Sequence, residues 1–316
     1  MFEAKAMLYL YVETPLHAGS GTSLGVVDLP VQRERVTNYP MVQASGIKGK
    51  LRAEASDHPN KTSDQEWTKK VEIVFGPDTQ RASEHAGAFS PGDARLLLFP
   101  VRSLIGVFAW TTSKDALARF CRDAKTIGLP FNWQAIGPED KSHDPKEAEK
   151  TALVAPGNDV TADGKVVLEE FAFDAEEDQQ VKAIAEWLAS NALPTDSEYD
   201  YWRKKLPKSL VILPENAFRD FTQFSTEVVN RIRLENETKT VAEGALWSEE
   251  HLPTDTLLYA PLFATKPRVD KSKLPQGWQG TAQEVLDFLK NLRLNRVQLG
   301  GDETVGRGLV KLRIEP

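Results

Sequence analysis

Residues 6–13 have the sequence AMLYLYVE, and this stretch decides the fold class. Hydrophobic side chains fill both sets of alternating positions, so the pattern predicts a β-strand covered on both faces. Further strands are predicted at 94–101 (ARLLLFPV), 106–112 (GVFAWTT) and 256–264 (TLLYAPLFA), the first two forming a hairpin. Helical segments lie between these strands, which predicts an α+β fold around an antiparallel sheet.

The helices are predicted from caps and apolar spacing. Ser45 is expected to cap a helix through about residue 56 with Ile47, Leu51 and Ala55 facing inward, and Lys48 and Arg52 on one side of it. Other helices are expected at 64–76, after Ser113, and at 176–190, 215–224 and 281–292. The remaining strands are expected at 165–173 (KVVLEEFAF), 209–214 (SLVILP) and the last segment, LVKLRIE.

Composition excludes several classes of protein. The 316 residues are 41% hydrophobic, enough for one enlarged domain with a proper core or one core fold with insertions. The single cysteine, Cys121, excludes a disulfide framework and a cysteine-based zinc site. The apolar run near the N-terminus is too short to span a bilayer and lacks a signal-peptide pattern. We therefore expect a cytoplasmic protein with no membrane partner.

Charge is unevenly distributed along the chain. The net charge of −7 argues mildly against a free-standing nucleic-acid binder, because phosphate contacts need Lys and Arg. Acidic residues crowd into 139–149 and 169–178, whereas basic residues gather in 33–52 and 290–313. The pattern is compatible with one positive face on an acidic body.

Two glycine-rich loops lack the signatures of nucleotide cofactors. GSGTSLG at 19–25 is followed by Val-Val-Asp, without the Lys-Ser/Thr pair of a phosphate-binding loop or the third glycine of a dinucleotide site. GGDETVGRG at 300–308 fails both tests as well. Their bare backbone N–H groups could approach phosphates, although ordinary tight turns would explain the glycines equally well.

Two loop residues are candidates for chemistry. The five histidines are scattered and show no metal-ligand spacing. His17 precedes Asp28 on the same loop, at a position that suits acid–base work or a purely structural role. Asp28 lies in the apolar segment Val-Val-Asp-Leu-Pro, so it is either a turn former or a deliberately placed carboxylate.

The segment VVNRIRLENETKTVAEGALW at 228–247 is charged and β-prone, with a turn-like Glu-Asn-Glu in its middle. It is expected to form a protruding hairpin, poorly ordered by itself because its charge leaves little to bury. Residues 128–165 are polar and rich in Pro, Gly and Asp, and we interpret them as an insertion.

Four segments together carry a resemblance to a known family. GSGTSLGVVDLPVQRER (19–35), SGIKGKLR (45–52), RIRLENETKTVAEGALW (231–247) and VQLGGDETVGRG (297–308) occur in this order. They closely resemble the backbone subunit of Cmr-type (type III-B) CRISPR effector complexes, in the RAMP superfamily. The resemblance extends from about residue 6 to residue 313.

The resemblance implies a fold and an assembly. It implies a single RAMP-type domain over 1–316, with a ferredoxin-like (RNA-recognition-motif-like) palm, a variable inserted region at about 128–200 and a protruding thumb at about 228–247. Copies of such a subunit stack along the CRISPR RNA beside the other subunits of the Cmr-type complex. Each thumb enters the duplex of guide and target RNA and displaces a base pair at regular intervals.

The resemblance also assigns roles to residues. The family's cleaving carboxylate falls on Asp28, which would act with a divalent metal such as Mg²⁺ as base or metal ligand; His17 and Glu243 are secondary catalytic candidates. The RNA-binding candidates share a basic or glycine side chain at the matching motifs, and they are Lys48, Lys50, Arg52, Arg231, Gly300, Gly301, Gly306, Arg307 and Gly308.

Two alternatives within the superfamily remain open at this point. A non-cutting member would only organise guide and target as a scaffold, and the carboxylate of the GVVDLP segment favours the cutting subunit over it. A guide-processing endonuclease would act alone on the repeat hairpin and would need no filament interface.

Overall fold

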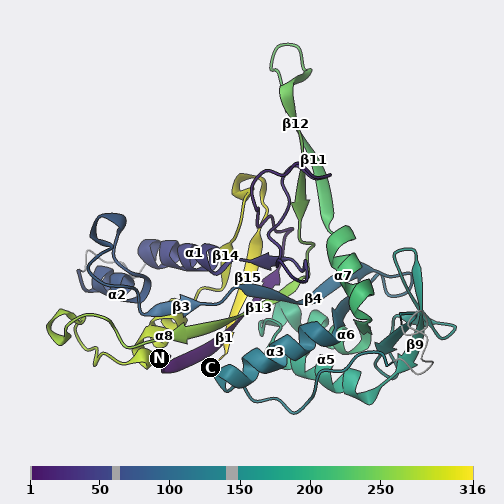
Figure 1. The fold of residues 1–316 in the computed structure, drawn as a ribbon, viewed down its shortest axis with the longest axis horizontal. Coiled ribbons are helices and arrows are strands. Elements are labelled where there is room, and N and C mark those ends of the chain that lie inside the picture. The colour runs from purple at the N-terminus through teal and green to yellow at the C-terminus, as the bar shows by residue number, and fades with distance from the viewer. Residues whose placement is uncertain (1, 59–64, 140–148, 316) are drawn as a thin grey trace.

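The computed structural model describes residues 2–58, 65–139 and 149–315. In these ranges a large mixed β-sheet and seven α-helices form the body, and a two-stranded hairpin projects from it (Figure 1). The helices are α1 (Ala44–Asp57), α2 (Gln65–Phe75), α3 (Lys114–Ile127), α5 (Gln179–Asn191), α6 (Asp200–Ser209), α7 (Glu215–Phe224) and α8 (Ala282–Asn291). The longer strands are β1 (Ala4–Val12), β4 (Ala94–Arg102), β5 (Phe108–Ser113), β9 (Phe171–Glu177), β11 (Glu227–Leu234), β12 (Val241–His251), β13 (Leu257–Ala264) and β15 (Leu309–Glu315).

The sheet has one antiparallel half and one mixed half. Strand order in the first half is β14-β15-β1-β13-β4, with every neighbouring pair antiparallel. The second half continues as β5-β10-β6-β9-β8-β7, in which β5–β10 and β6–β9 are parallel. The short strands are β2 (Met41–Val42), β3 (Phe89–Pro91), β6 (Thr151–Val154), β7 (Thr161–Ala162), β8 (Lys165–Leu168), β10 (Leu210–Leu213) and β14 (Arg296–Gln298). The α+β class predicted from the sequence is confirmed at this level, whereas the prediction of an antiparallel sheet holds only for the first half.

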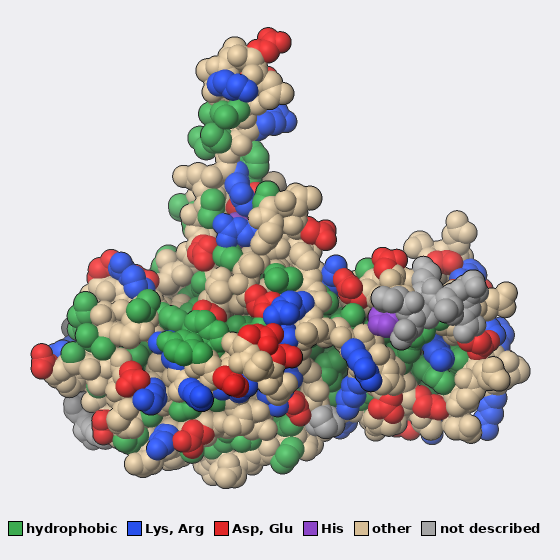
Figure 2. All heavy atoms as spheres, turned by 180° about the vertical axis from the view of Figure 1, so that it is seen from behind, with side chains coloured by type: hydrophobic (Ala, Val, Ile, Leu, Met, Phe, Trp, Pro, Cys, Tyr) green, Lys and Arg blue, Asp and Glu red, His purple; other side chains and the backbone are tan. Residues whose placement is uncertain are grey.

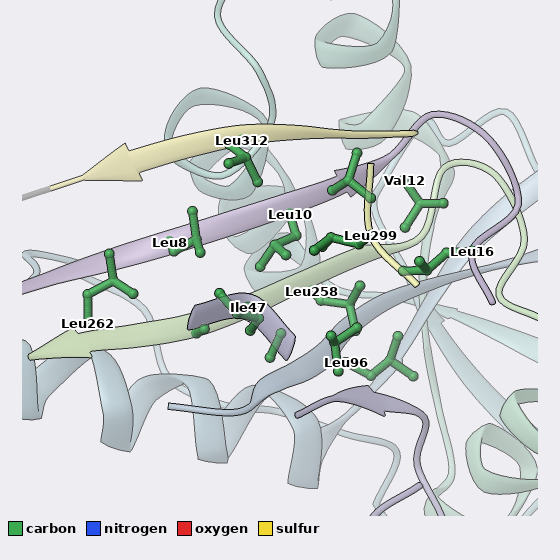
Figure 3. Close-up of a cluster of buried hydrophobic side chains, with 14 of the residues drawn as sticks. Leu8, Leu10, Val12, Leu16, Ile47, Leu96, Leu258, Leu262, Leu299 and Leu312 are labelled. Atoms are coloured by element: carbon green, nitrogen blue, oxygen red, sulfur yellow. The ribbon is translucent and has the colours of Figure 1, made fainter. Parts of the chain in front are cut away.

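Strand β1 is buried on both faces, as its sequence predicts. Leu8, Leu10 and Val12 belong to one hydrophobic cluster with residues of α1 and α8, and Figure 3 shows them beside leucines of β4 and β13. Tyr9 and Tyr11 belong to a second cluster with residues of α3, α5 and α6. Successive side chains of a strand point to opposite faces, so β1 contributes to both cores.

Most helix predictions are confirmed, but the cap of α1 is not. The residue before α1 is Gln43, which makes no side-chain capping bond; the Ala44 N–H donates instead to Asp93 Oδ1 at 2.8 Å. Ser45 therefore lies inside the first turn, because a residue from a distant segment satisfies the free amide. Ile47, Leu51 and Ala55 face the core as predicted. Ser113 caps α3 as predicted.

The single strand predicted at 165–173 is wrong, because this segment folds back on itself. Strands β8 and β9 pair as a hairpin, and Glu169 in the turn has φ = 49°. The turn was missed because it consists of Glu169 and Glu170, and glutamate is not a usual turn residue. Helix α6 was not predicted at all. Within the predicted polar region, β6 pairs with the buried strand β10 and so continues the main sheet.

The hairpin predicted at 228–247 is present and longer than predicted. Strands β11 and β12 pair from Glu227 with His251 to Leu234 with Val241. Its outer part leaves Ile232 and Leu246 exposed and projects well beyond the body (Figure 1). The inner end of β12 is buried at Glu249, Glu250 and His251. No helix in the described part of the chain is long and apolar enough to span a membrane.

A substitution in β1 tests the two-sided core. Leu10 is fully buried, so Leu10→Ala should lower the free energy of unfolding by about 2–5 kcal/mol through lost transfer energy and a residual cavity. Leu24→Ala is the matched control, because Leu24 is fully exposed and its truncation should change stability by less than about 0.5 kcal/mol. Urea unfolding followed by circular dichroism measures both. Equal losses would contradict this description of the core.

Candidate functional site at the base of the hairpin

Side chains at the inner end of β12 contact two different glycine-containing loops. Ser248 and Glu250 bond to the first loop, which follows β1, whereas Glu249 and His251 lie with Asp302 of the loop that precedes β15. Residues i and i+2 of a strand share one face, so this division follows from the strand's period of two. Four consecutive residues thereby join the hairpin to both loops.

Asp28 is held by Ser248 and is otherwise open to solvent. The Ser248 N–H and Ser248 Oγ both donate to Asp28 Oδ2 at 2.8 Å, and the Asp28 N–H donates to Ser248 Oγ at 3.0 Å. These hydrogen bonds lower the pKa of the Asp28 carboxyl below its ordinary value, and the bond from the Ser248 N–H has the largest effect. The apolar neighbours do not enclose it: Val26 is fully exposed, so the apolar setting suggested by the sequence is wrong.

Glu250 anchors the same loop from the buried side. Its carboxylate accepts hydrogen bonds from the Val31 N–H at 2.9 Å, the Thr226 hydroxyl at 2.8 Å and the Arg33 guanidinium at 2.5 Å. The backbone adds two bonds, from the Leu29 N–H to the Ser248 carbonyl and from the Glu250 N–H to the Leu29 carbonyl, both at 3.0 Å. The loop that carries Asp28 is thus fixed to β12 at several points.

Glu249, His251 and Asp302 bring three ligand-type atoms within 4.8 Å of one another. Arg231 already supplies positive charge there, since its guanidinium lies 2.8 Å from Glu249 Oε2 and 3.5 Å from Asp302 Oδ2. Burial opposes ionisation of Glu249, but the hydrogen bonds from Trp247 and Arg231 hold its pKa below the ordinary value. Burial lowers the pKa of His251, so this ring is neutral at pH 7. The cluster is a bridge between hairpin and loop.

His17 lies beside this bridge. Its Nδ1 is 2.7 Å from the Glu250 carbonyl oxygen, and its ring centroid is 5.4 Å from that of His251. The structure thus brings His17 to the base of the hairpin, where its contacts are with Glu250 and His251. Glu243 lies five residues from Ser248 along β12, about 16 Å for an extended strand, and it is exposed on the outer hairpin. Glu243 is therefore separated from Asp28.

A groove of about 630 Å³ lies between the two loops and α1. Glycines form much of its lining, and Lys50 is the one Lys or Arg among the residues that line it: His17, Ala18, Gly19, Gly21, Leu29, Gln32, Val42, Gly46, Gly49, Lys50, Gln298, Leu299, Gly300 and Gly301. An added Cβ at Gly46 or Gly49 would meet nothing within 4 Å, so both leave open space on α1. Glycines in the lining let the backbone of a bulky polar polymer approach closely.

The other basic candidates bond within the protein. Lys48 Nζ donates to the Phe89 carbonyl at 2.9 Å, and Arg52 donates to the Pro77 carbonyl at 3.3 Å. Burial, with Arg52 and Arg268 nearby, lowers the pKa of Lys48. Arg307 lies 3.6 Å from Glu227 of β11. This geometry favours Lys50 as the basic side chain that meets a ligand in the groove.

The glycines at 300–308 are needed for packing more than for free N–H groups. The N–H groups of Gly301, Gly306 and Gly308 donate to the carbonyls of His17, Glu303 and Pro15 at 2.9–3.0 Å. Because these amides are engaged within the protein, they would have to give up these bonds to reach a phosphate. A Cβ at Gly300 would meet the His17 carbonyl oxygen at 2.1 Å, so close backbone approach explains this glycine.

Comparison with known proteins decides the family. The family model described as "RAMPs: RAMP superfamily" matches residues 9–311. The chain belongs to the RAMP superfamily. It is 39% identical over 97% of its length to the CRISPR system Cmr endoribonuclease Cmr4 of Pyrococcus furiosus, covering 94% of that protein. It is 27% identical over 96% of its length to the CMR subunit Cmr4 of Saccharolobus solfataricus, covering 94% of it.

A solved structure extends the likeness of this RAMP chain to three dimensions. Oligomeric Cmr4 from Pyrococcus furiosus superposes with a TM-score of 0.70 at 30% identity, over 99% of this chain and 98% of that one. The resemblance stated from four sequence segments is thus confirmed over nearly the full length.

Sequence reasoning found Asp28 and both loops of this RAMP chain but missed Ser248, Glu249, His251 and Asp302. The segment Ser-Glu-Glu-His at 248–251 offered one available signal, since polar residues continue where β12 enters the body.

Figure 2 shows acidic and basic side chains interspersed over one face, so no single positive surface dominates that view.

A pair of glycine substitutions tests the close approach of the two loops. Gly300 and Gly306 have φ = 76° and 77°, so alanine at either should cost about 1–3 kcal/mol from backbone strain. Gly300→Ala should cost more than Gly306→Ala, because only at Gly300 does a Cβ meet the His17 carbonyl. Urea unfolding of both variants measures the difference. Equal destabilisation would show that the loops are not in contact here.

Proposed function

We propose that this chain is the target-cleaving backbone subunit of a Cmr-type CRISPR effector complex. It binds the guide RNA and cuts complementary target RNA at regular intervals, with Asp28 as the cleaving carboxylate. The observation that carries the proposal is the 39% identity over 97% of the chain to a Cmr endoribonuclease. An exposed carboxylate held at the base of the projecting hairpin supports it.

The finer description of the fold belongs to this proposal. Strand order β15-β1-β13-β4 with α1 after β1 and α8 after β13 supports a ferredoxin-like, RNA-recognition-motif-like palm, since that fold alternates strands and helices in this way. The projecting β11–β12 pair, with exposed Ile232 and Leu246, supports a thumb that enters the guide–target duplex. The single-domain description and an inserted region at about 128–200 remain predictions.

The proposed partners are the guide RNA, the target RNA, copies of the chain and other subunits of the complex. The related Pyrococcus protein crystallises as an oligomer, which supports self-association. The glycine-lined groove with Lys50 is the proposed seat of the guide backbone. Lys50 forms an ion pair with Glu54, which it would have to break to contact a phosphate. Because surface ion pairs contribute little to stability, this exchange costs little.

The chemistry needs few protein groups. The 2′-hydroxyl of RNA attacks the adjacent phosphorus once the backbone is splayed so that attacking and leaving oxygens are in line, and a displaced nucleotide supplies that geometry. The bond from phosphorus to the 5′-oxygen breaks as the new bond forms, which leaves a 2′,3′-cyclic phosphate and a 5′-oxygen that takes a proton from water. Asp28 then accepts the hydroxyl proton or orients the attacking group. Its lowered pKa keeps it ionised yet makes it a weak base, which favours orientation or metal ligation over proton abstraction.

Asp28 fits a divalent cation such as Mg²⁺. Mg²⁺ prefers oxygen ligands and is often held by one carboxylate together with phosphates, and Asp28 is exposed with only Oδ2 engaged by Ser248. A cation held there would stabilise negative charge that develops on the phosphate. Glu249, His251 and Asp302 fit a cation less well, because the Arg231 guanidinium already lies against both carboxylates. His17 has the smaller catalytic role in this proposal.

Asp28→Ala should abolish cleavage, with a rate loss of roughly 10²–10⁴-fold or more, because the reaction loses the carboxylate that acts as base or metal ligand. The measurement is cleavage of labelled complementary RNA by the assembled complex with Mg²⁺, beside an affinity measurement for guide and target. His17→Ala is the comparison and should have a smaller effect. Evenly spaced products at the normal rate from the Asp28→Ala complex would overturn the assignment of Asp28 as the cleaving carboxylate.

Lys50→Glu should weaken guide binding and reduce the slope of log affinity against log salt by about 0.7, the loss of one contact to a single-stranded phosphate. The same change at Lys182, exposed on α5 away from the groove, is the charge-matched control. Paired reversal of Lys48 and Arg52 should have a smaller effect on the salt slope, because both side chains donate to protein carbonyls. An unchanged slope for Lys50→Glu would place the guide elsewhere.

A further inference from the structure

Asp28 is an exposed side chain on an exposed loop, yet its orientation is fixed. Residues 20–26 are all exposed, so the surrounding segment offers little packing to restrict the side chain. In the described part of the chain, no Lys, Arg, His, Asp or Glu side chain forms a hydrogen bond or ion pair with Asp28. The hydrogen bonds to the Asp28 carboxylate come from Ser248, which lies on a strand 220 residues away in the sequence.

The contact between Asp28 and Ser248 is closed and reciprocal. Ser248 Oγ accepts from the Asp28 N–H at 3.0 Å while its hydroxyl donates to Asp28 Oδ2 at 2.8 Å, and the Ser248 N–H donates to the same oxygen at 2.8 Å. A serine hydroxyl donates and accepts at once, so one short side chain fixes both the backbone and the carboxylate of Asp28. Oδ2 is thereby fixed and Oδ1 is left toward solvent.

The neighbours of Ser248 on β12 leave it free for this role. Glu249 turns to Arg231 and Trp247, and Glu250 turns to Val31, Arg33 and Thr226. Glu249 and Glu250 are therefore paired with Arg231 and Arg33, and Ser248 between Trp247 and Glu249 bonds to the Asp28 carboxylate.

We propose that Ser248 is the positioning residue of the cleavage site, which holds Asp28 Oδ2 so that Oδ1 faces the RNA. The inference rests on the proposed function, since it assigns a partner to the proposed cleaving carboxylate. A catalytic carboxylate held in one orientation before substrate arrives avoids the entropic cost of ordering it during reaction. Because Ser248 lies on the strand that runs to the hairpin tip, it also makes the orientation of Asp28 depend on where the hairpin lies.

The test compares Ser248→Ala, Ser248→Thr and Asp28→Ala in the assembled complex. Ser248→Ala should slow target cleavage at saturating target by about tenfold with guide and target affinities unchanged, because the backbone N–H bond remains while both hydroxyl bonds are lost. Ser248→Thr keeps the hydroxyl and should restore the rate. Ser225→Ala, at a half-buried serine that follows α7, is the control and should leave the rate unchanged.

A second measurement follows the carboxyl group itself. In the purified chain labelled with ¹³C at the aspartate carboxyl carbon, the Asp28 signal is identified by its absence from the Asp28→Asn variant. The hydrogen bonds from Ser248 favour the ionised form, so Ser248→Ala should move the measured pKa of Asp28 up toward the ordinary aspartate value, and Ser248→Thr should move it back.

The outcomes separate this inference from the proposed function. If Asp28→Ala stops cleavage while Ser248→Ala cuts at the normal rate with an unchanged Asp28 pKa, Asp28 is the cleaving residue and Ser248 does not position it. If Asp28→Ala cuts normally, the proposed function fails whatever Ser248 does. A slow Ser248→Ala complex that threonine does not rescue and whose Asp28 pKa is unchanged would make Ser248 merely structural, and the inference would be wrong.

Discussion

The structure depends on the junction where β12 leaves the body, at Ser248 to His251. Alternation along the strand sends Ser248 and Glu250 to the first loop and Glu249 and His251 to the last one. Two loops that begin almost 300 residues apart are thereby fixed to one short piece of backbone. The groove, the carboxylate and the hairpin are therefore parts of one unit, and a displacement of the hairpin would be transmitted to both loops.

The polar contacts at this junction differ in what they contribute. Glu250 is buried and fully hydrogen-bonded, so removing any of its partners would leave a buried charge unsatisfied. Arg231 joins Glu249 to Asp302 and offsets part of their negative charge. Asp28, by contrast, is exposed and bonded on one oxygen only. The buried groups hold the architecture, and the exposed carboxylate is the one available to a ligand.

Two glycines of the last loop are needed for close packing as well as for their backbone conformation. Gly300 lies against the His17 backbone and Gly308 against the Leu299 carbonyl, where a Cβ would come within 2.1 Å and 2.0 Å. Glycine there lets the last loop pack closely against the backbone of the first loop and of Leu299. Gly46 and Gly49 of α1 have open space instead, so they shape the groove rather than the packing.

The sequence by itself determined the strands of the core, most helices and the hairpin, and it singled out Asp28 as a candidate, because alternation, apolar spacing and four ordered segments are local or linear signals. The four ordered segments also indicated the family. Only the tertiary structure decided which groups surround Asp28, since Ser248 is 220 residues away and no local pattern links the two. It likewise turned Lys48, Arg52 and Arg231 toward protein acceptors, whereas their charge alone suggested RNA. Side-chain partners are chosen by packing between distant segments, and that information appears only when the chain is folded.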